Sequence, residues 1–190
     1  MTTILGIDAG HTDLRAAEHW LHAFVDRLDH PDGLMACTHL VRQPFPHVAI
    51  SLSMPSPMAD DQLPDDAVVV GGRADRAARR GLADLARPAH LAAQWHTTRR
   101  GGRAVVYPGV ERLTGLRTVG EVLSWSAIDR IALLGGSTLG HAEPPLDMVV
   151  DTRDFLRPQW KDGTLTLLVQ QAAGARLVPF EVPDPTPCCS

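Results

Sequence analysis

The stretch GEVLSWSAIDRIALLGGSTLG, residues 120–140, decides the fold that this sequence predicts. It begins with a short amphipathic helix and continues into an apolar strand, residues 131–134, which ends on Gly135 and Gly136. A strand that is apolar on both faces belongs in the middle of a sheet that is covered on both sides. Just upstream, Thr118 and Glu121 form a capping-box pattern, which predicts a helix over residues 119–127.

Strands and helices alternate over the first 135 residues, and strands dominate after them. Apolar strands are predicted at 2–8 and 67–70, and a terminal hairpin at 164–170 and 176–182. Helices are predicted at 14–28, 74–86 and 90–96. The first helix has Thr12 or Asp13 as its N-cap and an apolar stripe along one face, and Pro88 interrupts the second. This pattern favours an α/β fold, with a mostly parallel sheet flanked by helices and an antiparallel C-terminal extension. We expect one domain over residues 1–182 and an extended Pro/Cys tail over 183–190. The strands near 4–7, 67–70 and 131–134 are expected to be parallel neighbours or near neighbours in one sheet.

Composition limits the class of protein. The chain has 190 residues, 44% of them hydrophobic and 21% charged, which is ordinary globular usage. No apolar run approaches the roughly 20 residues of a membrane span, and no basic segment precedes the apolar N-terminus. Three cysteines are too few for a disulfide framework, so a cytoplasmic location is expected. Only one of the 18 basic residues is lysine, a bias that indicates a GC-rich bacterial genome.

Charge is divided unevenly along the chain. Residues 1–70 contain three Arg and ten acidic residues, a net charge of −7, whereas residues 71–117 contain ten Arg and three acidic residues, a net charge of +7. The middle segment is therefore the candidate surface for an anion or an acidic partner. Nucleic acid is a weaker interpretation, because the whole chain is acidic, although the segment does hold a group suited to stacking and phosphate contacts: Trp95, His96, Arg99, Arg100 and Arg103.

Glycine-rich loops follow three of the predicted strands. If those strands are parallel, their loops lie on one edge of the sheet, where open α/β sheets bind ligands. Glycine lets backbone N–H groups approach an anion, and two arginines add charge at the start of the next helix. The predicted ligand-binding residues are Gly71, Gly72, Arg73, Arg76, Gly135, Gly136, Ser137 and Thr138. Neither the dinucleotide fingerprint nor the phosphate loop with its lysine is present, so the sequence assigns no cofactor.

Three residues are candidates for catalysis at these strand ends. Asp8 ends the first strand and His11 follows it, and Asp151 ends a strand near residue 150. An aspartate facing the glycine loops would act as an acid, a base or a magnesium ligand. Paired charge at a strand end is the competing interpretation.

A metal site is a further hypothesis. His19, His22 and Asp26 share one face of the first helix at spacings that permit a common metal ion. Cys188 and Cys189 lie together on the proline-rich tail, and Cys37 has the character of a small core residue. A solvated helix face is the alternative for the histidines, and an ordinary terminus is the alternative for the cysteine pair.

Two classes of function remain open beside a metal-handling protein. The first is binding or enzymatic conversion of a small anionic metabolite, phosphorylated or nucleotide-like, at the glycine-loop edge. The second is a non-catalytic protein that docks a protein partner or another copy of itself through the Arg-rich segment and the Cys-Cys tail. The sequence contains no nucleophile–base pattern that identifies a reaction.

Overall fold

The computed structural model describes residues 2–71, 83–134 and 143–182, which divide into two compact units. The first unit comprises Met1–Pro108 and Trp160–Gly163, and the second comprises Gly109–Gln159 and Thr164–Ser190. Each unit is described by itself. The expectation of one domain over residues 1–182 stays a prediction. The predicted tail over 183–190 lies outside the described residues.

The first unit is built on an antiparallel sheet. Along the sheet the strand order is β4-β1-β3-β2-β5-β9, and β1 pairs antiparallel with both β3 and β4. β2 likewise pairs antiparallel with β3 and β5. The bounds of the strands are β1 Thr3–His11, β2 Met35–Val41, β3 His47–Met54, β4 Val68–Val70, β5 Arg103–Val106 and β9 Gln159–Lys161, of which Gln159 is assigned to the second unit.

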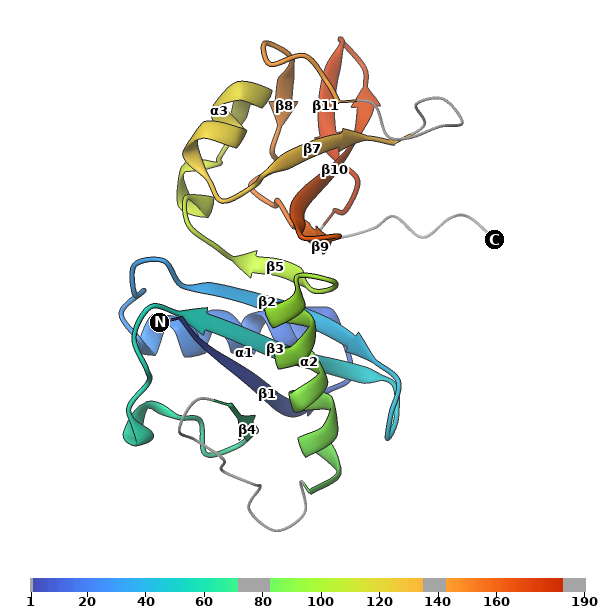
Figure 1. Cartoon of the computed structure of the whole chain (residues 1–190). Helices are drawn as coiled ribbons and strands as arrows, with labels where there is room; N and C mark the ends of the chain where they lie inside the picture. Colours follow the sequence, from blue (N-terminus) through green and yellow to red (C-terminus); the bar gives the residue numbers. More distant parts are fainter. Residues whose placement is uncertain (1, 72–82, 135–142, 183–190) are drawn as a thin grey trace. The chain divides into compact units, whose positions relative to one another are not determined.

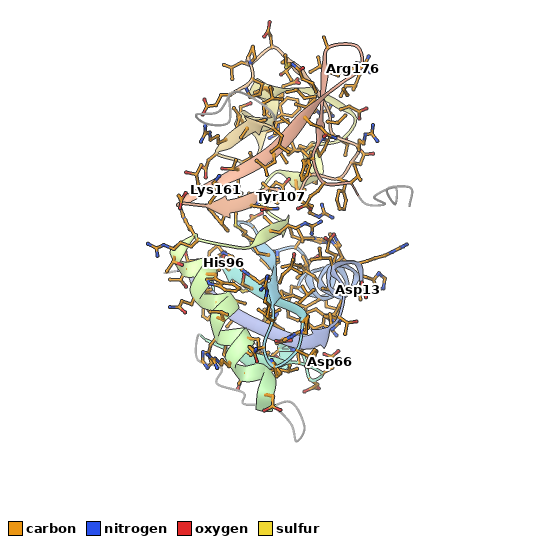
Figure 2. All side chains as sticks on the ribbon, turned by 90° about the vertical axis from the view of Figure 1, so that its right-hand side faces the viewer. Asp13, Asp66, His96, Tyr107, Lys161 and Arg176 are labelled. Carbon is orange, nitrogen blue, oxygen red and sulfur yellow. The ribbon has the colours of Figure 1, made fainter. Side chains whose placement is uncertain are left out.

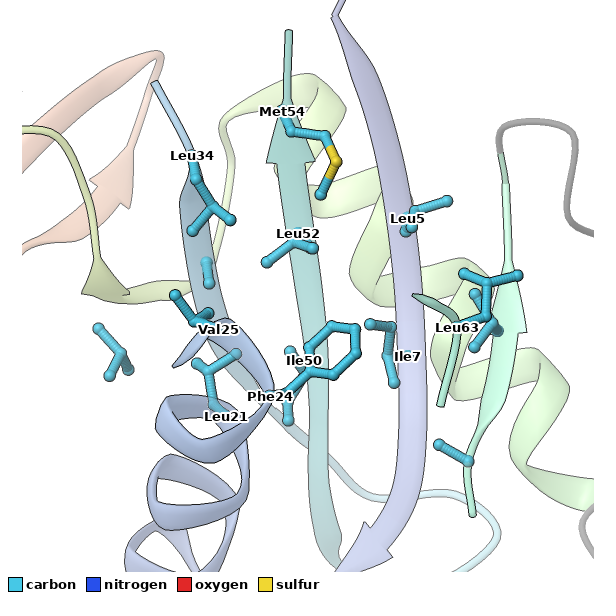
Figure 3. Packing of buried hydrophobic residues seen from close by; sticks show 14 residues of the cluster. Leu5, Ile7, Leu21, Phe24, Val25, Leu34, Ile50, Leu52, Met54 and Leu63 are labelled. Atoms are coloured by element: carbon cyan, nitrogen blue, oxygen red, sulfur yellow. The ribbon is translucent and has the colours of Figure 1, made fainter. Parts of the chain in front are cut away.

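Two helices cover opposite faces of this sheet, α1 (Leu14–Arg27) and α2 (Ala86–Thr98), as Figure 1 shows. Phe24 and Leu21 of α1 pack on Ile7, Ile50 and Leu52 of the strands (Figure 3). The other face carries α2, whose Ala89 and Ala92 are completely buried. The short 3-10 helices η1 (Asp60–Gln62) and η2 (Ala83–Leu85) lie in the connections.

The second unit is a smaller mixed sheet with one α-helix among its described residues. β10 pairs antiparallel with β11 and parallel with β7, and β8 connects β11 to β6. The bounds are η3 Val110–Arg112, β6 Leu116–Thr118, α3 Val119–Trp125, β7 Arg130–Leu133, β8 Val149–Asp151, β10 Thr164–Ala172 and β11 Arg176–Pro179. Neither unit contains a described helix long and apolar enough to cross a membrane.

The predicted mostly parallel sheet is wrong, because the sheet is mostly antiparallel. β1 and β4 are neighbours as expected, but they run in opposite directions, and β7 belongs to the second unit. The error has a physical cause. A strand that is apolar on both faces indicates cover on both faces, not strand direction, and β3 is buried at all eight positions while pairing antiparallel on each side.

Several local predictions are confirmed. Asp13 caps α1 by accepting a hydrogen bond from the backbone N–H of Ala16 at 2.8 Å. Thr118 and Glu121 form the predicted capping box at α3, and β10 and β11 form the predicted hairpin. The predicted helix over 90–96 lies within α2, and Pro88 lies in its first turn, where the missing N–H removes no intrahelical hydrogen bond. Most of the predicted helix over 74–86 lies outside the described residues, so its interruption at Pro88 stays a prediction.

Candidate functional site

Asp8 and His47 form a buried pair at the end of β1. Their side chains are 0% exposed, and Oδ2 of Asp8 lies 2.8 Å from Nε2 of His47. The other ring nitrogen of His47, Nδ1, donates to the carbonyl oxygen of Phe45 at 2.7 Å, and Oδ1 of Asp8 accepts from the N–H of Gly10 at 2.9 Å. Burial raises the pKa of Asp8. Both ring nitrogens of His47 are thus occupied, and the pair ties the loop before β3 to β1.

His11 follows the pair at the last position of β1. Its ring is half-buried and lies 5.8 Å from the ring of Trp20, and its Nε2 has no hydrogen-bond partner among the described residues. Burial lowers the pKa of His11, while the carboxylates of Asp66, Asp8 and Asp13 oppose that shift. Asp66 also accepts a hydrogen bond from Nε1 of Trp20 at 3.1 Å; Figure 2 labels Asp66 and Asp13.

Asp151, the third catalytic candidate, belongs to the second unit. It is the last residue of β8, and its Oδ1 accepts from the N–H of Arg153 at 3.2 Å. Arg153 and Asp154 have positive φ angles of 52° and 51°. Asp151 therefore stabilises the turn that leaves β8.

The loops after β1 and β4 lie at opposite ends of their shared ladder, not on one sheet edge as the sequence predicted. Val70 pairs with Gly6 and Val68 pairs with Asp8, so Gly71 leaves β4 beside the first residues of β1, at the opposite end of that ladder from His11. Gly71 has a φ of 98°, and an added Cβ would lie 2.6 Å from the carbonyl oxygen of Ile4. The remaining predicted ligand-binding residues lie outside the described residues: Gly72, Arg73, Arg76, Gly135, Gly136, Ser137 and Thr138.

The described residues contain no group of side chains that supports the metal hypothesis. His19, His22 and Asp26 are exposed on α1, and Oδ1 of Asp26 lies 3.0 Å from Nε2 of His30. Within residues 2–71, 83–134 and 143–182, no three His, Cys, Asp or Glu side chains are grouped to hold a metal ion. Cys188 and Cys189 lie outside those ranges, so the hypothesis that they bind metal stays a prediction.

A buried chain of polar side chains, His39–Ser51–His96, crosses from the sheet to α2. Oγ of Ser51 lies 2.7 Å from Nε2 of His39 and 2.7 Å from Nδ1 of His96. All three residues are buried, and Figure 2 labels His96 on α2. Burial lowers the pKa of His39 to about 3 and that of His96 to about 4, so both rings are neutral at pH 7.

The hydrogen bonds of the His39–Ser51–His96 chain have a preferred donor and acceptor at each step. Nδ1 of His39 is buried without a partner among the described residues. An unpaired lone pair there costs less than an unpaired N–H, which assigns the proton of His39 to Nε2, from where it donates to Oγ of Ser51. Ser51 then donates to Nδ1 of His96. The sequence interpretation missed this chain because residues 34–46 gave no clear element, so His39 could not be placed on a strand beside Ser51.

Cys37 lies next to this chain, where it is completely buried with a free thiol, as predicted for a core residue. Burial raises its pKa to about 12, and the neighbouring side chains of Ser51 and Trp160 oppose that shift. The thiol is therefore neutral and unreactive in the folded protein.

Two arginines of the second unit lie on one tryptophan. The guanidinium carbon of Arg112 is 4.8 Å from the ring centroid of Trp125, and that of Arg117 is 5.6 Å away. Arg117 is held in place because its Nε donates to the carbonyl oxygen of Arg112 at 3.2 Å and its Nη1 donates to that of Leu116 at 2.8 Å. Neither arginine forms an ion pair with a described carboxylate. We call Arg112 and Arg117 the Trp125 arginine pair.

Other residues of the Arg-rich segment are less available to a ligand or partner. Arg103 pairs with Glu18 of α1, both side chains being 12% exposed. His96, one of the residues proposed for stacking on nucleic acid, is buried in the His39–Ser51–His96 chain. Two residues of the suggested nucleic-acid surface are thus engaged inside the first unit.

Described residues of the first unit line two open cavities. The larger, of about 410 Å³, lies between the end of α1 and the segment after β3, and includes Leu28, Met54 and Met58. The smaller, of about 290 Å³, lies between the Gln43–Pro44 turn and the start of α2, where Asp84 and Arg87 bring opposite charges to it. No protein-family model, curated protein or solved structure matches this chain.

Proposed function

We propose that the second unit binds a small anionic metabolite, phosphorylated or carboxylated, at the Trp125 arginine pair. One observation supports the proposal above the others: two guanidinium groups lie on the same indole ring and have no carboxylate partner among the described residues. Both arginines belong to the segment of net charge +7, residues 71–117, and Arg117 is its last residue. The proposal keeps the ligand class expected from the sequence and moves it from the glycine loops to this pair.

The arrangement favours an anion for electrostatic reasons. Arg112 is exposed and Arg117 is half-buried, and two like charges that share one ring repel each other. An anion that lies between them replaces this repulsion with two attractions. Guanidinium groups match phosphate and carboxylate oxygens with two parallel N–H donors, and Arg112 makes no hydrogen bond through its own guanidinium N–H groups among the described contacts.

Preorganisation strengthens the case for Arg117. Its guanidinium is already oriented by two carbonyl oxygens, so little side-chain freedom is lost when a ligand arrives. The indole of Trp125 is half-buried and excludes water from one side of the guanidinium groups, which strengthens their interaction with an anion.

The test is a titration with inorganic phosphate and pyrophosphate at low ionic strength, followed through the tryptophan indole N–H signals. The chain has four tryptophans, and Trp125→Phe identifies the relevant signal. We expect a saturable shift of the Trp125 signal, weakened at least about threefold by Arg112→Ala and by Arg117→Ala. Arg176→Ala, an exposed arginine of the same unit that Figure 2 labels, is the matched control and leaves binding unchanged.

Two results would contradict the proposal. One is the absence of a saturable shift at Trp125 with either anion. The other is an equal loss of affinity in Arg112→Ala, Arg117→Ala and Arg176→Ala, which would show a general charge effect and no site.

A protein partner with an acidic surface is the second candidate function. Leu116 is 47% exposed next to Arg117, and Leu146 is 65% exposed where its carbonyl accepts from the N–H of Gly120 at 2.9 Å. Arginine is enriched at protein interfaces, and exposed leucines such as these would add apolar contact area to one. Leu116→Ser separates the candidates, because it leaves phosphate binding intact and weakens capture of a partner or self-association.

We further propose that the protein resides in the cytoplasm with its three cysteines reduced. Cys37 is a free thiol, and a disulfide between the adjacent Cys188 and Cys189 would strain its own peptide link. Alkylation in denaturant without reductant should label three thiols. A lower count in metal-free protein contradicts this expectation.

A further inference from the structure

The larger of these two cavities has a lining that is mostly apolar. Its apolar residues come from the end of α1, from the loop after it, and from the segment that follows β3: Leu28, Pro31, Met54, Pro55, Pro57 and Met58. Its volume of about 410 Å³ falls in the range of small-ligand sites. Figure 3 shows Met54 at the end of β3, where it meets the core cluster of this unit.

The polar part of the lining carries a single charge. Asp32 is the one ionisable residue among the lining residues, and Ser56 and Gln62 are the uncharged polar ones. Asp32 is exposed and forms no ion pair or hydrogen bond with another described residue. The side-chain carbonyl of Gln62 is already occupied, because it accepts from the N–H of Ala59 at 3.0 Å. The carboxylate of Asp32 is therefore the polar group most available to a ligand.

From this geometry we infer that the cavity binds a small organic ammonium ion with an aliphatic body. The methionines and prolines receive the aliphatic part, and Asp32 pairs with the ammonium group. Methionine side chains adapt to ligands of varied shape, which suits an unbranched chain. The net charge of −7 over residues 1–70 favours a cation over an anion in this part of the molecule. The cavity and the Trp125 arginine pair lie in different units, so this inference is independent of the proposed function.

The experiment compares n-hexylammonium with n-hexanol and n-hexanoate, which share the chain and differ in charge. Binding is followed by the methyl signals of the five methionines after ¹³C labelling, with Met54→Leu and Met58→Leu identifying the two cavity signals. We expect hexylammonium to shift the Met54 and Met58 signals in a saturable manner. Met148, in the second unit, is the internal reference and stays unshifted.

Two variants with the same change of charge test the role of Asp32. Asp32→Asn should weaken hexylammonium binding at least about threefold. Asp29→Asn is the matched control: Asp29 is an exposed neighbour that does not line the cavity, and its φ of 57° is one that asparagine adopts readily. It should leave binding unchanged.

Any of three results overturns the inference. The first is no shift of the Met54 and Met58 signals with hexylammonium. The second is that hexanol or hexanoate shifts them as strongly, which would show that charge plays no part. The third is an equal effect of Asp32→Asn and Asp29→Asn, which would show that only the overall charge of the unit matters.

Discussion

The hydroxyl oxygen of Ser51 lies 2.7 Å from Nδ1 of His96, and this contact joins β3 to α2 through the interior of the first unit. His39 extends the contact to β2, also at 2.7 Å. Polar groups buried to this extent are stable only while they are hydrogen-bonded to one another. The three residues therefore fix the position of α2 on the sheet by satisfying each other and not by apolar contact alone.

We expect Ser51→Ala to lower the free energy of unfolding by about 1–3 kcal/mol, because it leaves ring nitrogens of both histidines without a partner. Ser53→Ala is the matched control on the same strand, since Ser53 is 8% exposed and makes no such contact. Urea denaturation measures both variants. Equal losses of stability would mean that the hydrogen bonds of Ser51 contribute nothing specific.

The stability of the protein should fall as the pH is lowered below about 6.5. His39 and His96 have lowered pKa values of about 3 and about 4 in the folded state, so the unfolded chain takes up protons first. Each histidine then removes roughly 1.4 kcal/mol of stability per pH unit between pH 6.5 and its folded pKa. Urea denaturation at several pH values from 5 to 8 measures the slope. A stability that is constant from pH 7 to pH 5 would contradict the assigned neutral rings.

Removing His47 should be far more harmful than neutralising Asp8. His47→Ala leaves a buried carboxylate without its partner, which costs about 3–5 kcal/mol. Asp8→Asn removes the charge, keeps the oxygen that accepts from the N–H of Gly10, and should cost less. Denaturation of the two variants compares them directly. If Asp8→Asn proves the costlier change, the pair does not act by neutralising a buried charge.

Gly71→Ala should destabilise the protein more than Gly174→Ala does. Both glycines have positive φ angles, 98° and 76°, which alanine adopts at a cost of about 1–3 kcal/mol. At Gly71 the added methyl would also lie 2.6 Å from the carbonyl oxygen of Ile4, whereas nothing lies within 4 Å at Gly174. Thermal unfolding of each variant tests the difference. A similar change in Tm for both would show that β4 is not held close to β1.

The candidate site could be predicted only in part. Arginine enrichment over residues 71–117 is visible in the sequence, and it contains Arg112 and Arg117. That these two meet on Trp125 is not visible, because the 3-10 helix η3, strand β6 and helix α3 must first fold against one another. The cavity beside Met54 likewise combines the end of α1 with the segment after β3, which lie more than 20 residues apart in the chain.

The sequence by itself determined the local elements of this protein. Asp13 as a cap, the apolar stripe of α1 and the capping box at Thr118 all depend on residues within a few positions of one another, and each is found in the structure. Only the tertiary structure decided the direction in which the strands run and which side chains meet. Strand direction depends on pairing between distant segments, such as β1 with β3 and β4. An apolar strand can be buried in a parallel or in an antiparallel sheet once helices cover both faces, so its composition does not fix its direction.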